Sequence, residues 1–76
     1  MIDSKWHGMH MRQARIDAGM TLQELSSKAG IVHSTVSSLE TGKRNPSLAT
    51  VMLLANALGL SIDEYVGHEP KGERDD

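Results

Sequence analysis

The chain contains no cysteine and no phenylalanine, only two prolines, and a single tryptophan and tyrosine among its 76 residues. Without cysteine it forms neither disulfides nor thiolate-bound zinc sites, an absence that fits a reducing compartment. No apolar run approaches the roughly 18 residues that a membrane span needs, and residues 1–5 lack the apolar core of a secretion signal. We therefore expect a cytoplasmic protein with no membrane partner.

A large excess of positive charge is also missing, because the formal net charge is −2. The charge is uneven: residues 67–76 carry four acids and two bases, residues 1–66 carry six of each, and residues 28–47 carry three bases and one acid. A nucleic-acid binder needs a local positive patch rather than a basic composition. Residues 28–47 provide a thin patch of this kind.

Helical spacing of apolar residues dominates the chain, with no sustained alternation of the kind that predicts strands. The pattern predicts five helices, over residues 8–18, 22–29, 33–41, 48–58 and 62–66. We expect an N-terminal arm over 1–7, one helical domain over 8–66, and a disordered acidic tail over 67–76. Such a small domain buries only about 60% of its unfolded surface, so dimerisation would help to stabilise it.

Local signals mark where these helices begin and end. Thr21 with Glu24, and Ser61 with Glu64, have the spacing of capping boxes at two helix starts. Glycine follows four of the helices, as is typical of a left-handed C-terminal cap. The apolar positions expected to point inward include Val32, Leu48 and Met52.

Two short helices joined by a turn at Gly30 form the most informative part of the chain. The second, over 33–41, has a narrow apolar stripe, so it can stand out from the surface and enter a DNA major groove. Its opposite face is polar and consists of His33, Ser34, Ser37, Ser38 and Thr41. The basic loop Lys43-Arg44-Asn45 follows directly.

Together these features resemble the Cro/repressor-type, or Xre-like, helix-turn-helix family over roughly residues 8–66. The matching positions include Gly8 at the opening of the first helix, Arg15, Thr21 to Gly30, Val36 to Leu48, and Ala57 to Ile62. The resemblance implies an all-α, five-helix, lambda-repressor-like domain. It also implies a sequence-specific transcriptional regulator that binds double-stranded DNA as a dimer on a palindromic operator, with helix 33–41 in the major groove.

The resemblance further implies roles for individual residues. Base contacts fall on His33, Ser34, Ser37 and Ser38, and phosphate contacts on Thr21, Gln23, Thr35, Thr41, Lys43, Arg44 and Asn45. A structural ion pair joins Arg15 to Glu40, and a homodimer contact uses Ile62, Tyr65 and Val66. Two positions depart from the family: Leu22 stands where a glutamine usually contacts phosphate, and Val32 stands where serine or threonine often caps the third helix.

Simpler interpretations stand beside these roles. The serines lack the two-pronged geometry of the best base-reading side chains, and Lys43 and Arg44 also suit the negative end of a helix dipole. His7 and His10 have metal-ligand spacing but no neighbouring carboxylate or thiol, so we expect an exposed first turn and no metal.

No catalytic constellation stands out, so we expect neither an enzyme nor a cofactor or small-molecule ligand. A phage-type repressor, a restriction-modification controller and an antitoxin are three settings that fit the main prediction. The alternative function is a protein-interaction module, such as an antitoxin-type or degenerate helix-turn-helix domain with little DNA binding.

Overall fold

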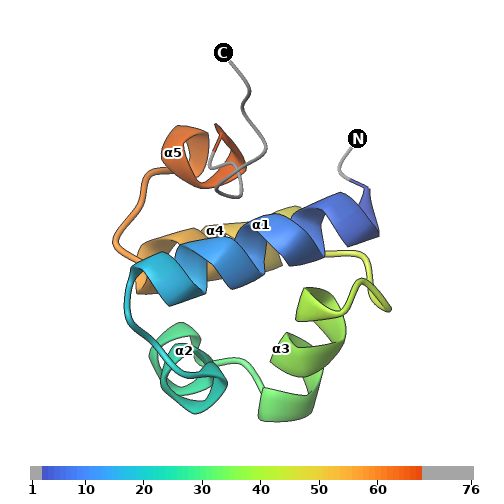
Figure 1. The fold of residues 1–76 in the computed structure, drawn as a ribbon, viewed down its shortest axis with the longest axis horizontal. Helices are drawn as coiled ribbons and strands as arrows, with labels where there is room; N and C mark the ends of the chain where they lie inside the picture. Colours follow the sequence, from blue (N-terminus) through green and yellow to red (C-terminus); the bar gives the residue numbers. More distant parts are fainter. Residues whose placement is uncertain (1–2, 68–76) are drawn as a thin grey trace.

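Residues 3–67 are the part of the chain that the structure, a computed structural model, describes. This part contains five helices and no strand, which confirms the all-α, five-helix prediction (Figure 1). The helices are α1 (Ser4–Asp17), α2 (Leu22–Ala29), α3 (His33–Glu40), α4 (Leu48–Ala57) and α5 (Ile62–Gly67). Beyond Gly67, the predicted acidic tail lies outside the described residues.

The first helix begins four residues earlier than the sequence pattern predicts. The carboxylate of Asp3 accepts a hydrogen bond from the backbone N–H of Trp6 at 3.0 Å, so Asp3 is the N-cap. Residues 4–7 of the expected arm are therefore helical, and Gly8 lies inside α1 rather than at its opening.

The other helix ends follow the local signals closely. Both predicted capping boxes are present, with Thr21 and Glu24 exchanging hydrogen bonds of 2.8 and 3.0 Å, and Ser61 and Glu64 of 2.8 and 3.1 Å. The four glycines that follow α1 to α4 all have φ between +70° and +81°. Only glycine adopts this backbone conformation without a steric penalty, so each of these residues ends its helix.

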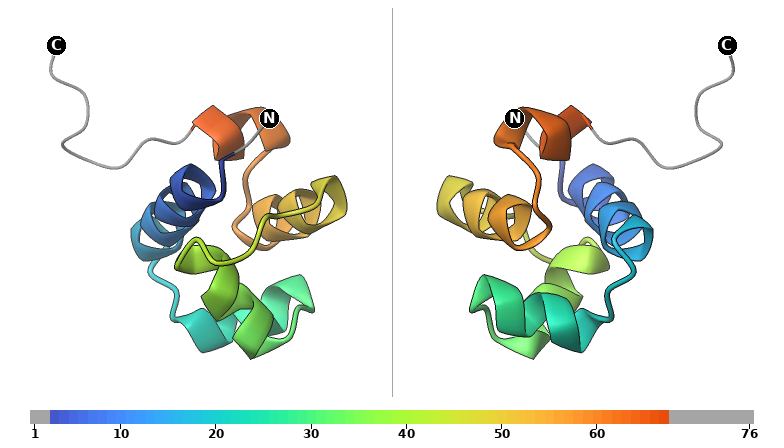
Figure 2. Two further views of the ribbon diagram at one scale, coloured as in Figure 1. Left: turned by 90° about the vertical axis from the view of Figure 1, so that its right-hand side faces the viewer. Right: turned by 90° about the vertical axis from the view of Figure 1, so that its left-hand side faces the viewer.

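The five helices enclose one small core. α1 packs on α3 and α5, α2 packs on α3 and α4, and α4 packs on α5 (Figure 2). The largest fully buried side chains at its centre are Met11, Leu25, Val36, Leu39, Leu54, Tyr65 and His7. Within residues 3–67, no helix is both long and apolar enough to cross a membrane.

Three apolar side chains that the pattern placed in the core are on the surface. Val32, Leu48 and Met52 are 70%, 72% and 53% exposed. Val32 is the N-cap residue of α3, and Leu48 is the first residue of α4. Met52 lies on the outer side of α4, whose apolar residues extend beyond the stripe that the core covers.

Candidate nucleic-acid interface

The polar face of α3 points away from the core. Val36 and Leu39 are buried against the domain, whereas His33 and Ser34 are exposed and Ser37 and Ser38 are partly exposed. Figure 1 shows α2 and α3 together along one side of the molecule, away from α5. The four side chains predicted to contact bases therefore remain accessible on one helix face.

The N-terminus of α3 has no side-chain cap. Val32 occupies the N-cap position and its carbonyl accepts from the backbone N–H groups of Thr35 and Val36, both at 3.0 Å. The helix still begins at His33, so the missing serine or threonine cap does not delay it. Thr35, predicted to contact phosphate, lies partly exposed in this first turn.

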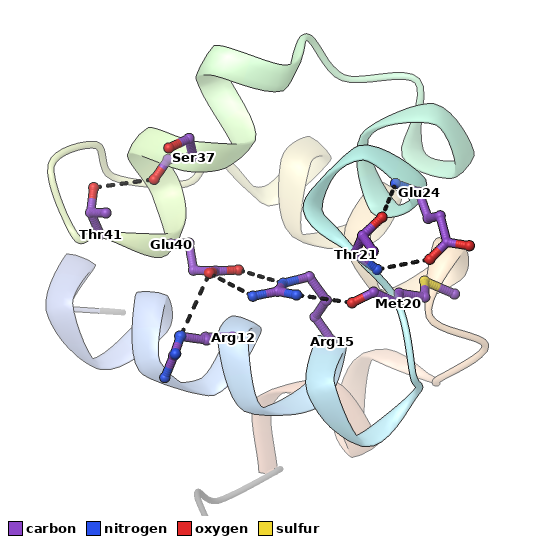
Figure 3. Close-up of polar contacts among 8 residues, drawn as sticks. All are labelled: Arg12, Arg15, Met20, Thr21, Glu24, Ser37, Glu40 and Thr41. Carbon is purple, nitrogen blue, oxygen red and sulfur yellow. Dashed lines mark hydrogen bonds and ion pairs between the residues drawn. The ribbon is translucent and has the colours of Figure 1, made fainter.

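A bidentate ion pair fixes the other end of α3 to α1, as predicted. The guanidinium of Arg15 donates to both carboxylate oxygens of Glu40, at 2.8 and 2.9 Å, and also to the carbonyl of Met20 at 2.9 Å (Figure 3). The two side chains are only 14% and 9% exposed. The hydrogen bonds to Glu40 raise the pKa of Arg15 above its ordinary value, so its guanidinium stays charged.

Gly8 brings the backbones of α1 and α3 into direct contact. A Cβ atom at this position would lie 2.5 Å from the carbonyl oxygen of Glu40 and 2.8 Å from that of Leu39. Only a residue without a side chain permits this approach.

The start of α2 presents two of the predicted phosphate contacts. Thr21 and Gln23 are exposed, and the Thr21 hydroxyl accepts the backbone N–H of Glu24 (Figure 3). Leu22 between them turns inward and packs against the core. Leu22 therefore anchors the helix, and Gln23 is the polar side chain left facing solvent next to Thr21.

The remaining predicted phosphate contacts follow α3. Thr41, Lys43, Arg44 and Asn45 are all exposed. The Thr41 hydroxyl donates to the carbonyl of Ser37 at 3.1 Å, and the backbone N–H of Lys43 donates to the carbonyl of Ser38 at 2.9 Å. These bonds hold the base of the loop against the last turn of α3, while its cations extend into solvent.

The charge distribution along α3 and the loop after it favours the binding of an anion. From residue 25 to residue 62 the chain contains one acid, Glu40, and Arg15 neutralises it. Within residues 3–67, neither Lys43 nor Arg44 has an ion-pair partner. The loop after α3 therefore carries two cations, and the exposed face of α3 carries no free carboxylate.

The predicted dimer contact needs one correction. Ile62 is 36% exposed and Val66 is partly exposed, but Tyr65 is 1% exposed and lies in the core. Its hydroxyl is 2.7 Å from Nε2 of His7, a bond that joins α5 to α1. Two grooves flank Ile62, and the exposed apolar side chains that line them are Leu48, Met52, Leu53 and Val66.

The histidines of the first helix are also placed differently from the prediction. His7 and His10 are 1% and 4% exposed, rather than on an exposed turn. His10 donates from Nδ1 to the carbonyl of Trp6 and stacks on its ring at 3.7 Å between centroids. Burial, with a smaller contribution from His10, lowers the pKa of His7 to about 4. Among residues 3–67, no three side chains of the metal-binding types gather at one point.

Comparisons with known proteins agree with this geometry. The model of the helix-turn-helix family matches residues 11–65. An uncharacterized HTH-type transcriptional regulator of Sinorhizobium fredii is 39% identical over 59 residues, which cover 78% of this chain and 77% of the relative. Another curated relative is longer: the immunity repressor of Bacillus phage phi105 is 32% identical, and the match spans 82% of this chain but only 43% of that protein.

Two solved structures share the fold at similar identity. The restriction-modification controller protein C.AhdI from Aeromonas hydrophila superposes with a TM-score of 0.79 and 32% identity, covering 83% of this chain and 96% of that one. The N-terminal DNA binding domain of SinR from Bacillus subtilis gives a TM-score of 0.75 and 30% identity, covering 91% and 99%.

Proposed function

Because this chain belongs to the Cro/repressor-type helix-turn-helix family of transcriptional regulators, we propose that it binds a specific palindromic site on double-stranded DNA as a homodimer. In this proposal α3 lies in the major groove of each half-site. The protein acts in the cytoplasm without a cofactor or small-molecule ligand and is not an enzyme.

The exposed polar face of α3 beside an unpaired basic loop carries the proposal. A helix in the major groove needs short polar side chains toward the base edges and cations toward the phosphates at the groove's rim. His33, Ser34, Ser37 and Ser38 supply the first group. Lys43 and Arg44 supply the second, with Asn45, Thr21, Gln23, Thr35 and Thr41 as neutral phosphate contacts around the same helix.

The side chains of α3 also determine how strongly the protein discriminates between bases. Serine hydroxyls donate and accept single hydrogen bonds, and they lack the bidentate pairing that arginine makes with guanine. Base discrimination per monomer is therefore modest, and specificity rests on two half-sites and on DNA shape. Two recognition helices on one face of the duplex read half-sites about 34 Å apart.

Exposed apolar surface supports the dimer. Leu48, Met52 and Ile62 lie along α4 and the start of α5 with 36–72% of their surface exposed, an arrangement typical of a surface that a partner covers. We assign the self-contact to Ile62 and Val66 with these α4 residues, and we leave out the buried Tyr65.

Selection of bound fragments from genomic DNA tests the proposal directly, because it yields the site and its dyad spacing together. On the selected duplex, Lys43→Gln and Arg44→Gln should each flatten the dependence of log K on log salt by about one unit per lost contact. Each of the two substitutions should weaken binding to random duplex as much as it weakens binding to the selected duplex. Ser37→Ala should weaken binding to the selected duplex only, since a base contact carries the sequence information.

The same apolar surface on α4 and α5 is the observation that favours the second candidate, a protein-interaction module with little DNA binding. A mobility-shift titration on random duplex at low salt separates the two. A regulator binds and releases as salt rises, whereas a pure interaction module leaves the duplex unshifted even at the lowest salt.

A further inference from the structure

The first turn of α1 lies directly against the turn that ends α3. A Cβ atom built on Gly42 would be 3.1 Å from both Cα and Cγ of Lys5, so the Lys5 backbone and stem rest on this glycine. Gly42 has φ +81°, and Lys43 and Arg44 follow it directly. Figure 1 shows the start of α1 beside the connection from α3 to α4. Lys5, although far from residues 43–45 in sequence, therefore lies beside the basic loop.

The charge of Lys5 is free at this position. Lys5 is exposed, and within residues 3–67 it has no ion-pair partner. The nearest acid in sequence, Asp3, accepts the backbone N–H of Trp6 as the cap of α1. No acid occurs between residues 41 and 62, so the loop that Lys5 borders carries no carboxylate to neutralise it.

We propose that Lys5 is a third cationic phosphate contact, which adds a cation on α1 to the two of the basic loop, Lys43 and Arg44. This inference rests on the proposed function and adds a residue that precedes the matched family region, residues 11–65. The long, flexible stem of a lysine suits a point contact with a phosphate at the edge of a groove. Because Gly8 and Arg15 join the same helix to α3, a phosphate held by Lys5 also fixes the orientation of the recognition helix.

A pair of substitutions isolates the charge from the packing. Lys5→Gln keeps the stem that lies on Gly42 and removes the ammonium, whereas Lys5→Arg keeps both the stem and the charge. Thermal melting of both variants, compared with the parent protein, checks that the fold is intact. Binding is then measured on the selected duplex and on random duplex from 0.05 to 0.5 M salt, a range of about tenfold.

We expect Lys5→Gln to flatten the salt slope by about 0.9 per monomer and to weaken binding to both duplexes about fivefold at about 0.15 M salt. Lys5→Arg should restore both quantities. An unchanged slope in Lys5→Gln, with Lys43→Gln still flattening it, overturns the role of Lys5 and leaves the proposed function in place. Absence of duplex binding by the parent protein overturns both.

Discussion

Replacing Gly8 with alanine tests whether α1 sets the position of the recognition helix. The new Cβ would lie 2.5 Å from the carbonyl oxygen of Glu40, whereas ordinary contact begins at 3.4 Å. The obstructing atoms are backbone atoms of α3, so no side-chain rotation relieves the overlap. The two helices must therefore separate by about 0.9 Å, the difference between these distances.

Two effects of opposite sign compete in this substitution. Alanine in a helix interior is favoured over glycine by about 0.5–1 kcal/mol, whereas overpacking a tight contact costs about 1–3 kcal/mol. The separation also stretches the Arg15–Glu40 hydrogen bonds, now 2.8 and 2.9 Å. We therefore place the cost at the upper end and expect a net loss of about 2 kcal/mol, or about 8–16 °C in melting temperature.

Thermal unfolding followed by circular dichroism measures this loss. Met9→Ala is the matched control, because the neighbouring side chain in the same helix is 53% exposed and should change stability by no more than about 0.5 kcal/mol. Binding of Gly8→Ala to the selected duplex should fall more than binding to random duplex, since base contacts require the position of α3 and phosphate contacts require mainly charge. A Gly8→Ala protein that melts higher than the parent would refute the close approach, because helix propensity would then act alone.

Three further predictions concern the ion pair, the buried histidine and the self-contact. Arg15→Met should cost about 3 kcal/mol in denaturant unfolding, because it leaves the Glu40 carboxylate nearly buried with only Arg12, 3.8 Å away, beside it; adding Glu40→Gln should recover part of the loss, and no recovery would argue against a buried charge as its cause. Because burial, with a smaller contribution from the charge of His10, lowers the pKa of His7 from 6.5 to about 4, the unfolded chain takes up this proton first as pH falls. Stability should therefore drop between about pH 6.5 and pH 4 by up to about 3 kcal/mol, and the same drop in His7→Gln would exclude His7 as its source. Ile62→Glu should convert the proposed dimer to monomer in sedimentation experiments, with Met9→Glu as the control on α1; a dimer that survives Ile62→Glu places the contact elsewhere.

The helix ends could be predicted from the sequence because their causes are local. A capping box needs residues three apart, and a left-handed cap needs one glycine, so both are visible without knowledge of the fold. The start of α1 was mispredicted because Gly8 resembles a helix opener, although Asp3 with its short polar side chain offered an N-cap signal.

The core was harder to predict because periodicity shows which residues are apolar but not what covers them. Leu48 and Met52 belong to an apolar helix whose outer side is left uncovered by residues 3–67. His7 and His10 were missed for the opposite reason. Together with Met11 and Ala14 they fall at positions i, i+3, i+4 and i+7, which is the buried stripe of a helix, but their polarity hid the pattern.

The base contacts stay a prediction, because the partner atoms proposed for Ser37 and Ser38 would belong to a DNA molecule and not to this chain. The Arg15–Glu40 pair could be predicted from the resemblance to the family, and the structure joins the two side chains. Prediction from one sequence therefore reaches the interactions that the chain makes with itself more readily than those it makes with a ligand.

The arrangement of α1 links the two surfaces that the proposed function requires. His7 bonds to Tyr65 and so holds α5, the helix of the proposed self-contact, while the adjacent Gly8 touches the backbone of α3. Arg15, seven residues further along α1 and therefore about two turns away, fixes α3 a second time. Two contacts separated along one helix define a direction as well as a position, so α1 sets the angle between the self-contact and the recognition helix. In a symmetric dimer that angle determines the distance between the two recognition helices, and hence which half-site spacing both can read at once.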